Sequence, residues 1–119
     1  MNVFLVEDSA LLRSRLETML AAIPGARTVG HAAGAQDAIQ AILAQRPDVV
    51  VLDIHLEQGN GFDVLQALQQ AALKTSVFVL TNYPNDAYRR KAEGLGARGF
   101  FDKSQELDSL RSALAAAAA

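Results

Sequence analysis

The 119-residue chain contains no cysteine, which excludes disulfide bonds and thiolate metal sites and suits a reducing compartment. It has no apolar run near the roughly 18 to 20 residues that a membrane-spanning helix needs. It also lacks a basic segment leading into an apolar one at its N-terminus, so a secretory signal is not indicated. From these absences we expect a cytoplasmic protein that does not bind a membrane.

Charge of one sign is not in excess either, because the formal net charge is -2. Without a basic excess we expect no direct binding to nucleic acid. Apolar residues make up 50% of the chain and charged residues 20%, a balance typical of a globular domain with one core. No linker, repeat or change of composition divides the chain, so we predict a single domain over residues 1–119.

Short apolar runs alternate along the chain with segments whose apolar residues recur at helical spacing. The predicted strands span residues 1–6, 27–31, 48–53, 76–80 and 98–101. Three predicted helices span residues 9–23, 35–45 and 86–94. Another begins after the turn at 59–61, and the last begins at residue 104. Five strands alternating with five helices predict an α/β fold with a doubly wound parallel sheet.

Two of these helices carry more specific predictions. In the helix at 35–45, the apolar residues expected to be buried are Ala38, Ile39, Ile42 and Leu43. Ser104 is expected to cap the last helix, because serine is favoured at that position. The alanines at 115–119 favour a frayed end of the same helix, since alanine is the best helix former.

Four of the predicted strands end in charged or hydroxyl-bearing residues. Glu7 and Asp8 follow the first strand, Asp53 ends the third, Thr81 follows the fourth, and Lys103 follows the fifth. Parallel strands bring their carboxyl ends to one edge of the sheet, where ligands and chemistry collect in open α/β folds. We therefore expect three carboxylates, a hydroxyl and an amine to converge at that edge.

Carboxylates that converge in this way repel one another by about 4 kcal/mol per close pair at an effective dielectric constant of about 20. A site that holds Glu7, Asp8 and Asp53 therefore needs a cation. Carboxylate oxygens with room for water are ligands typical of Mg²⁺. The residues thus predict a magnesium-assisted phosphoryl-transfer site.

The same residues stand in segments that resemble the receiver domain of two-component response regulators, and the resemblance covers the whole chain. The segments are Phe4–Ser9, Val50–Leu56, Gly61–Leu65, Val79–Thr81 and Gly96–Lys103. The resemblance implies the flavodoxin-like receiver fold, with five strands in the order 2-1-3-4-5 and five helices. It also implies a phospho-acceptor switch that works with a sensor histidine kinase or a phosphotransfer protein.

Residue by residue, the resemblance implies that Asp53 is the phospho-acceptor and also a ligand of Mg²⁺. Asp8 would bind the ion directly, and Glu7 would act on it through water. The remaining protein ligand would be the backbone carbonyl of His55, and not its imidazole.

The resemblance further implies a conformational switch. Lys103 would pair with Asp53 and then with the phosphoryl oxygens, Thr81 would move its hydroxyl onto the phosphate, and Phe100 matches the aromatic switch residue. The surface that changes would comprise the fourth helix, fifth strand and fifth helix, and it would bind a downstream protein target or an output domain. We expect this chain to carry no output domain and not to be a turnover enzyme. Formation of a homodimer is left open.

Five positions depart from the family or flank the acceptor. Ser104 follows the lysine where proline is frequent, which argues against a cis peptide bond there, and Glu57 replaces another frequent proline. Asn82 stands where a small residue is usual, so it would narrow access to the acceptor. His55 and Tyr83 would flank the approach of water, and we expect them to shield the phosphate from hydrolysis.

Other functions fit the residues less well. A flavodoxin-like flavin binder shares the fold, but Glu7 and Asp8 would repel its phosphate. A phosphatase of the haloacid dehalogenase type generally has a second aspartate two residues after its nucleophile, where this chain has His55. The alternative that stays open is a pseudo-receiver, a phosphorylation-independent interaction module, although such a module would be expected to have lost part of the acidic set or the lysine.

Overall fold

Five parallel strands form the central sheet of the computed structural model, which describes every residue from Met1 to Ala119. The strands are β1 (Asn2–Val6), β2 (Arg27–Ala32), β3 (Val49–Asp53), β4 (Ser76–Thr81) and β5 (Gly99–Asp102). Their order across the sheet is β2-β1-β3-β4-β5, and each neighbouring pair is parallel. This is the order that the resemblance implied, and every strand end lies within one residue of its predicted place.

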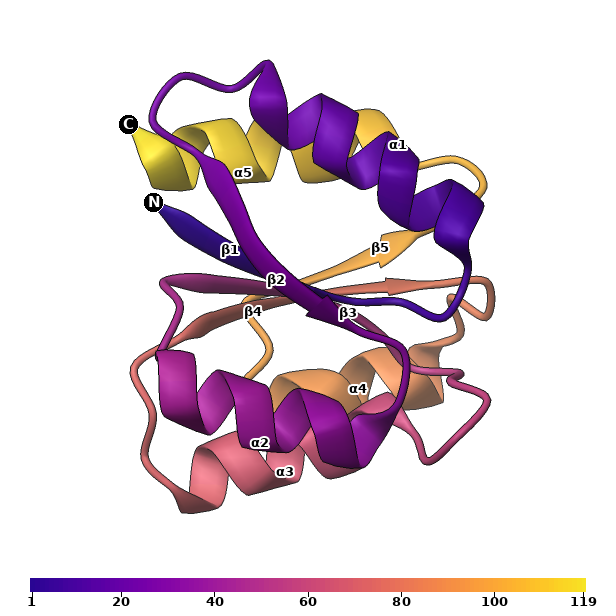
Figure 1. Cartoon of the computed structure of the whole chain (residues 1–119). Coiled ribbons are helices and arrows are strands. Elements are labelled where there is room, and N and C mark those ends of the chain that lie inside the picture. The colour runs from indigo at the N-terminus through magenta and orange to yellow at the C-terminus, as the bar shows by residue number, and fades with distance from the viewer.

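Five helices follow the strands in alternation and cover both faces of the sheet. The helices are α1 (Ala10–Ala21), α2 (Ala35–Gln45), α3 (Gly61–Gln70), α4 (Asp86–Gly94) and α5 (Leu107–Ala118). Helices α1 and α5 lie on one face, and α2, α3 and α4 lie on the other (Figure 1). The doubly wound α/β architecture is therefore confirmed. No helix combines the length and the apolar character needed to cross a membrane.

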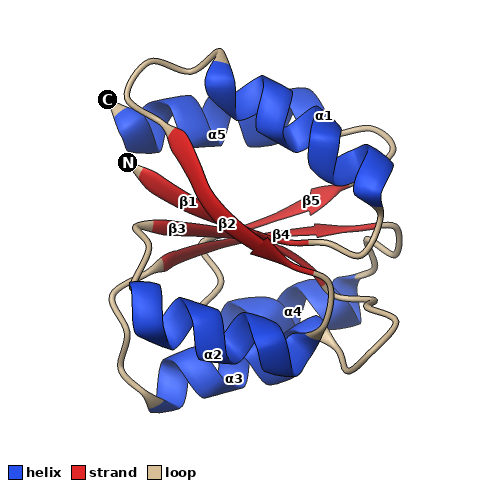
Figure 2. Cartoon of the chain, viewed as in Figure 1, coloured by secondary structure: helices blue, strands red, loops and turns tan.

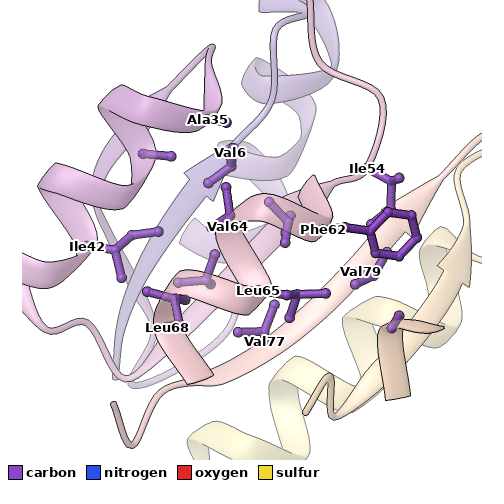
Figure 3. Packing of buried hydrophobic residues seen from close by; sticks show 14 of the residues in the cluster. Val6, Ala35, Ile42, Ile54, Phe62, Val64, Leu65, Leu68, Val77 and Val79 are labelled. Atoms are coloured by element: carbon purple, nitrogen blue, oxygen red, sulfur yellow. The ribbon is translucent and has the colours of Figure 1, made fainter. Parts of the chain in front are cut away.

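The two faces of the sheet carry two separate hydrophobic clusters. Every residue of β3 is buried, because a parallel strand with helices on both sides has no solvent-facing side. Successive side chains point to opposite faces, so Val49 and Val51 join the cluster under α1 and α5, while Val50 and Leu52 join the other. Figure 3 shows this second cluster, whose side chains come from α2, α3 and the strands beside them.

The bounds predicted for α2 are correct, but the predicted burial of Leu43 is wrong, since this side chain is 37% exposed. Ala38 and Ile42 stand four positions apart, face the sheet and are fully buried. Leu43 comes one position later, about 100° further around the helix, and so it points away from the sheet. Ile39 is partly buried against the edge of the same cluster.

The predicted cap of the last helix is also wrong. Helix α5 begins at Leu107, and Ser104 lies in the turn before it, where its N–H and its hydroxyl both donate to Oδ1 of Asp102. Local bonds of this kind compete with helix capping, because a serine or aspartate side chain can satisfy nearby backbone groups instead. The chain has no cis peptide bond, in agreement with the sequence, and its final alanines continue α5 as far as Ala118.

Candidate functional site

The polar residues predicted to converge meet at the carboxyl edge of the sheet, toward which the strand arrows point in Figure 2. Asp53 ends β3, which pairs with β1 on one side and with β4 on the other. It therefore lies between Glu7 and Asp8, which follow β1, and Thr81, which ends β4. One carboxylate oxygen from each of the three acidic residues lies within 4.8 Å of the others.

Lys103 reaches this acidic cluster from the end of β5. Its Nζ lies 2.8 Å from Oδ2 of Asp53 and 2.8 Å from Oε1 of Glu7. The three side chains are only 11%, 4% and 3% exposed, so water and salt screen these ion pairs weakly. The pairing with Asp53 was predicted, whereas the pairing with Glu7 was not. One ammonium against three carboxylates leaves the cluster with excess negative charge.

The electrostatics of the cluster reflect its burial. Burial raises the pKa of Glu7 and of Asp53 above their ordinary values, and the hydrogen bonds from Lys103 offset only part of this rise. Burial alone would lower the pKa of Lys103, but its hydrogen bonds to Asp53 and Glu7 raise it above its ordinary value. The lysine therefore stays charged, and the two carboxylates carry a desolvation cost that a further cation would relieve.

Backbone N–H groups hold each carboxylate of the cluster in place. Ser9 N donates to Oε2 of Glu7 at 3.0 Å, and His55 N donates to Oδ1 of Asp53 at 3.1 Å. The third bond crosses between two loops, since the N–H of residue 57 donates to Oδ2 of Asp8 at 2.9 Å. Such charge-assisted bonds restrict the side chains to one orientation. The cluster is thus arranged before any ligand binds.

Gly61 supports the acceptor in a way that the sequence reasoning missed. It begins α3, and its N–H donates to the carbonyl oxygen of Ile54 at 2.8 Å. A Cβ atom at this position would lie 2.5 Å from the carbonyl oxygen of Asp53, which is too close for any side chain. Only glycine lets α3 begin this near the acceptor. The signal was Gly61 in the glycine-rich turn at 59–61, which the sequence pattern marked as a helix start and as part of the family resemblance, but not as a support of the acceptor.

The rim of the site contains Thr81, His55 and Tyr83. Thr81 is buried; its Oγ1 accepts a hydrogen bond from Tyr83 N at 3.0 Å, and its carbonyl oxygen accepts one from Lys103 N at 2.8 Å. The ring of Tyr83 is exposed and packs on that of His55, with centroids 4.3 Å apart. Asn82, which stands between Thr81 and Tyr83 in the sequence, is exposed. The two rings expected to flank the acceptor therefore contact each other.

Phe100 is buried on the same face of the sheet as Thr81. It pairs in register with Val79, which stands two residues before Thr81 and so points to the same side. Arg89 of α4 lies over its ring, with Cζ 4.9 Å from the centroid, and its Nη1 is 3.5 Å from the Phe100 carbonyl oxygen. The aromatic residue thus connects the β4 end of the site to α4.

Comparison with known proteins agrees with this geometry. The sequence model of the response regulator receiver domain family matches residues 3–115 of this chain. The DNA-binding transcriptional activator DevR/DosR of Mycobacterium tuberculosis is 35% identical over 86% of this chain and 47% of its own length. A protein-glutamate methylesterase/protein-glutamine glutaminase of Myxococcus xanthus is 35% identical over 87% of this chain and 30% of its own length. The chain therefore spans half or less of these two relatives.

Solved structures share the fold almost completely. A two-component response regulator of the LuxR family from Aurantimonas is 26% identical with a TM-score of 0.90, covering 98% of this chain and 84% of that one. The response regulator domain of Thermotoga maritima CheB is 25% identical with a TM-score of 0.86, covering 99% and 92%. With its sheet order, its acidic edge and its family match in agreement, the chain belongs to the receiver domains of two-component response regulators.

Proposed function

We propose that this receiver accepts a phosphoryl group on Asp53 in a Mg²⁺-dependent reaction and thereby shifts between two conformations. The observation that carries the proposal is the cluster of Glu7, Asp8 and Asp53, whose oxygens lie within 4.8 Å of one another, beside a single ammonium. Three carboxylates at one buried edge cost stability unless a cation offsets their repulsion. The same arrangement suits a phosphoryl group, which arrives together with such a cation.

The donor set fits Mg²⁺, which takes oxygen ligands and keeps several waters. Asp8 and Asp53 would hold the ion directly, Glu7 would hold it through water, and the backbone carbonyl of His55 would add a further oxygen. When bound, the ion offsets the charge of the acceptor and of the phosphoryl oxygens. The acidic excess left after pairing with Lys103 supports this assignment.

In the proposed transfer, a carboxylate oxygen of Asp53 attacks phosphorus. The new O–P bond forms as the bond from phosphorus to the donor's leaving atom breaks, and the donor keeps that electron pair. With a phosphohistidine of a sensor kinase or phosphotransfer protein, the leaving atom is an imidazole nitrogen. His55 N at 3.1 Å and Lys103 Nζ at 2.8 Å hold the two oxygens of the acceptor, so the contribution of the chain is alignment.

The new phosphoryl group adds about 1.5 to 2 negative charges beside Lys103 and Thr81. Thr81 Oγ1 now accepts a bond from Tyr83 N, so turning its hydroxyl toward the phosphate would break that bond and move the β4–α4 loop. Phe100, on the same face, would then follow inward and change its contact with Arg89. Reversing a two-state equilibrium needs about 5.5 kcal/mol. Several charge-assisted hydrogen bonds of about 1.5 to 3 kcal/mol each would supply it.

The surface that reads this change would be α4, β5 and α5. Arg89 of α4 lies over the ring of Phe100 of β5, within this surface. Lys91 points to the other flank of α4, where its Nζ lies 4.4 Å from the ring centroid of Phe62 of α3. A downstream protein or an output domain would bind the surface of α4, β5 and α5, and a homodimer through this surface is a second arrangement. Direct contact with nucleic acid is not part of the proposal, because the net charge is -2.

The test is phosphorylation by a small-molecule donor. The protein is incubated with acetyl phosphate and Mg²⁺, and its intact mass should rise by one phosphoryl group. Excess chelator should abolish the gain, and beryllofluoride with Mg²⁺ should shift the NMR signals of Thr81 and Phe100. A chain that takes up no phosphoryl group and shows no shift with beryllofluoride would instead be a phosphorylation-independent pseudo-receiver.

A further inference from the structure

Glu106 stands at the N-cap position of α5 but does not cap that helix. Its side chain makes no bond to the first turn of α5, where serine, threonine, aspartate or asparagine would be favoured. Its Oε1 instead accepts a hydrogen bond from the backbone N–H of Asp102 at 3.0 Å. The carboxylate therefore reaches back across the loop that carries Lys103.

The N–H that Glu106 satisfies belongs to the edge strand of the sheet. Lys103 N donates to the carbonyl of Thr81 on β4, at 2.8 Å. Because successive N–H groups of a strand point to opposite sides, the N–H of Asp102 points away from β4, where no further strand follows. Glu106 supplies the acceptor that a sixth strand would otherwise provide.

Asp102 closes the same loop from the other side. Its Oδ1 accepts bonds from Ser104 N at 2.9 Å and from Ser104 Oγ at 2.8 Å. Its carbonyl oxygen accepts one from Glu106 N at 2.9 Å. Four hydrogen bonds thus connect Asp102 with Ser104 and Glu106, and Lys103 stands between them.

We propose that Asp102, Ser104 and Glu106 form a brace that positions Lys103 for phosphoryl transfer, with Glu106 as its central positioning residue. The inference rests on the proposed function of Asp53. A lysine ammonium sits on a flexible four-carbon stem, so its contact with two carboxylates at 2.8 Å depends on where its backbone is held. The brace holds that backbone on the side opposite to β4, and Thr81 holds it on the other.

The test compares Glu106→Ala with Glu106→Gln, because glutamine keeps an oxygen acceptor for the Asp102 N–H and alanine does not. The initial rate of phosphorylation by acetyl phosphate with Mg²⁺ should fall about tenfold in Glu106→Ala, since a displaced catalytic group loses alignment. It should stay within about twofold of wild type in Glu106→Gln. Asp108→Ala is the matched control, because Asp108 is an exposed carboxylate in the first turn of α5.

Two NMR measurements on the unphosphorylated proteins separate the brace from the proposed function. In Glu106→Ala, the Asp102 amide should exchange with solvent faster than in wild type, and the Lys103 ammonium signal should move toward that of an exposed lysine. Ser104→Ala, a milder change, should give smaller shifts in the same direction. Wild-type rate and unchanged Lys103 signals in Glu106→Ala would overturn the brace. Failure of wild type itself to be phosphorylated would overturn the function of Asp53, while the two NMR readouts would still test the brace.

Discussion

The ammonium nitrogen of Lys103 lies 2.8 Å from Oδ2 of Asp53, fifty positions earlier in the chain. The two residues meet because β3 and β5 both pair with β4, so their carboxyl ends stand at one edge of the sheet. The same ammonium lies 2.8 Å from Glu7 at the end of β1. One side chain thus joins three strand ends, and its displacement would be felt at each of them.

Asp53→Asn should abolish labelling by acetyl phosphate, because an amide is a poor nucleophile and a weaker ligand for Mg²⁺ than a carboxylate. Intact mass spectrometry measures the label. Asp63→Asn is a matched control, since Asp63 is an exposed aspartate in the first turn of α3. This variant should be labelled on Asp53 at the wild-type level. Label at the wild-type level on Asp53→Asn would show that another residue is the acceptor.

Lys103→Ala should still be phosphorylated, although more slowly, but it should lose the conformational change that phosphorylation causes at Phe100 and α4. The alanine variant removes the only ammonium at the carboxylates, so the phosphoryl charge has no partner at the end of β5. NMR shifts of Phe100 and α4 upon addition of beryllofluoride report the response. Thr81→Ala should reduce these shifts less than Lys103→Ala does. Shifts of wild-type size in Lys103→Ala would refute the coupling.

The contribution of Asp53 and Glu7 to the free energy of unfolding should fall as pH rises through the acid range in metal-free protein. Burial raises the pKa of Asp53 and Glu7 above their ordinary values of 3.8 and 4.5, so the folded state keeps protons that the unfolded chain has released. The fall above about pH 4 should be smaller in Asp53→Asn, which has one such group fewer. The raised pKa of Lys103 acts only above its ordinary value of 10.5, outside the acid range.

Urea unfolding in excess chelator, measured at several pH values, gives the two profiles. Comparing the variant with wild type cancels the contribution of the other carboxylates. A profile for Asp53→Asn that declines as steeply as that of wild type would contradict the burial argument.

Addition of Mg²⁺ should raise the free energy of unfolding of wild type at neutral pH. The rise should be about 1.4 kcal/mol at a Mg²⁺ concentration ten times the dissociation constant of the ion.

His55→Ala and Tyr83→Ala should each shorten the lifetime of the phosphorylated protein. Their rings pack on each other with centroids 4.3 Å apart, and the backbone N–H of His55 donates to Asp53, so removing either ring should loosen the other and open a path for water. Loss of the phosphoryl group with time, followed by intact mass, gives the lifetime. Asn82→Ala tests whether the phosphate is protected by the two rings or by the Asn82 side chain, which would narrow access to Asp53. Unchanged lifetimes in both ring variants would show that the rings lie at the rim of the site without slowing hydrolysis.

Local signals in the sequence were enough to predict the strands and helices and to place the polar residues at one edge of the sheet. Continuous apolar runs and helical spacing are local signals, so strands and helices could be predicted with small errors at their ends. The polar residues that end these runs, Glu7, Asp8, Asp53, Thr81 and Lys103, could then be placed together, since parallel strands share one carboxyl edge.

The partner that each polar group takes depends on the tertiary structure. Ser104 could cap a helix or bond to Asp102, and the position of α5 selects the second, while Glu106 gives up capping for the Asp102 N–H. The contact of Lys103 with Glu7 depends in the same way on distances between separate strands. Local sequence sets what each group is able to bond, but competing bonds of similar energy are resolved by the packing of elements far apart in the chain.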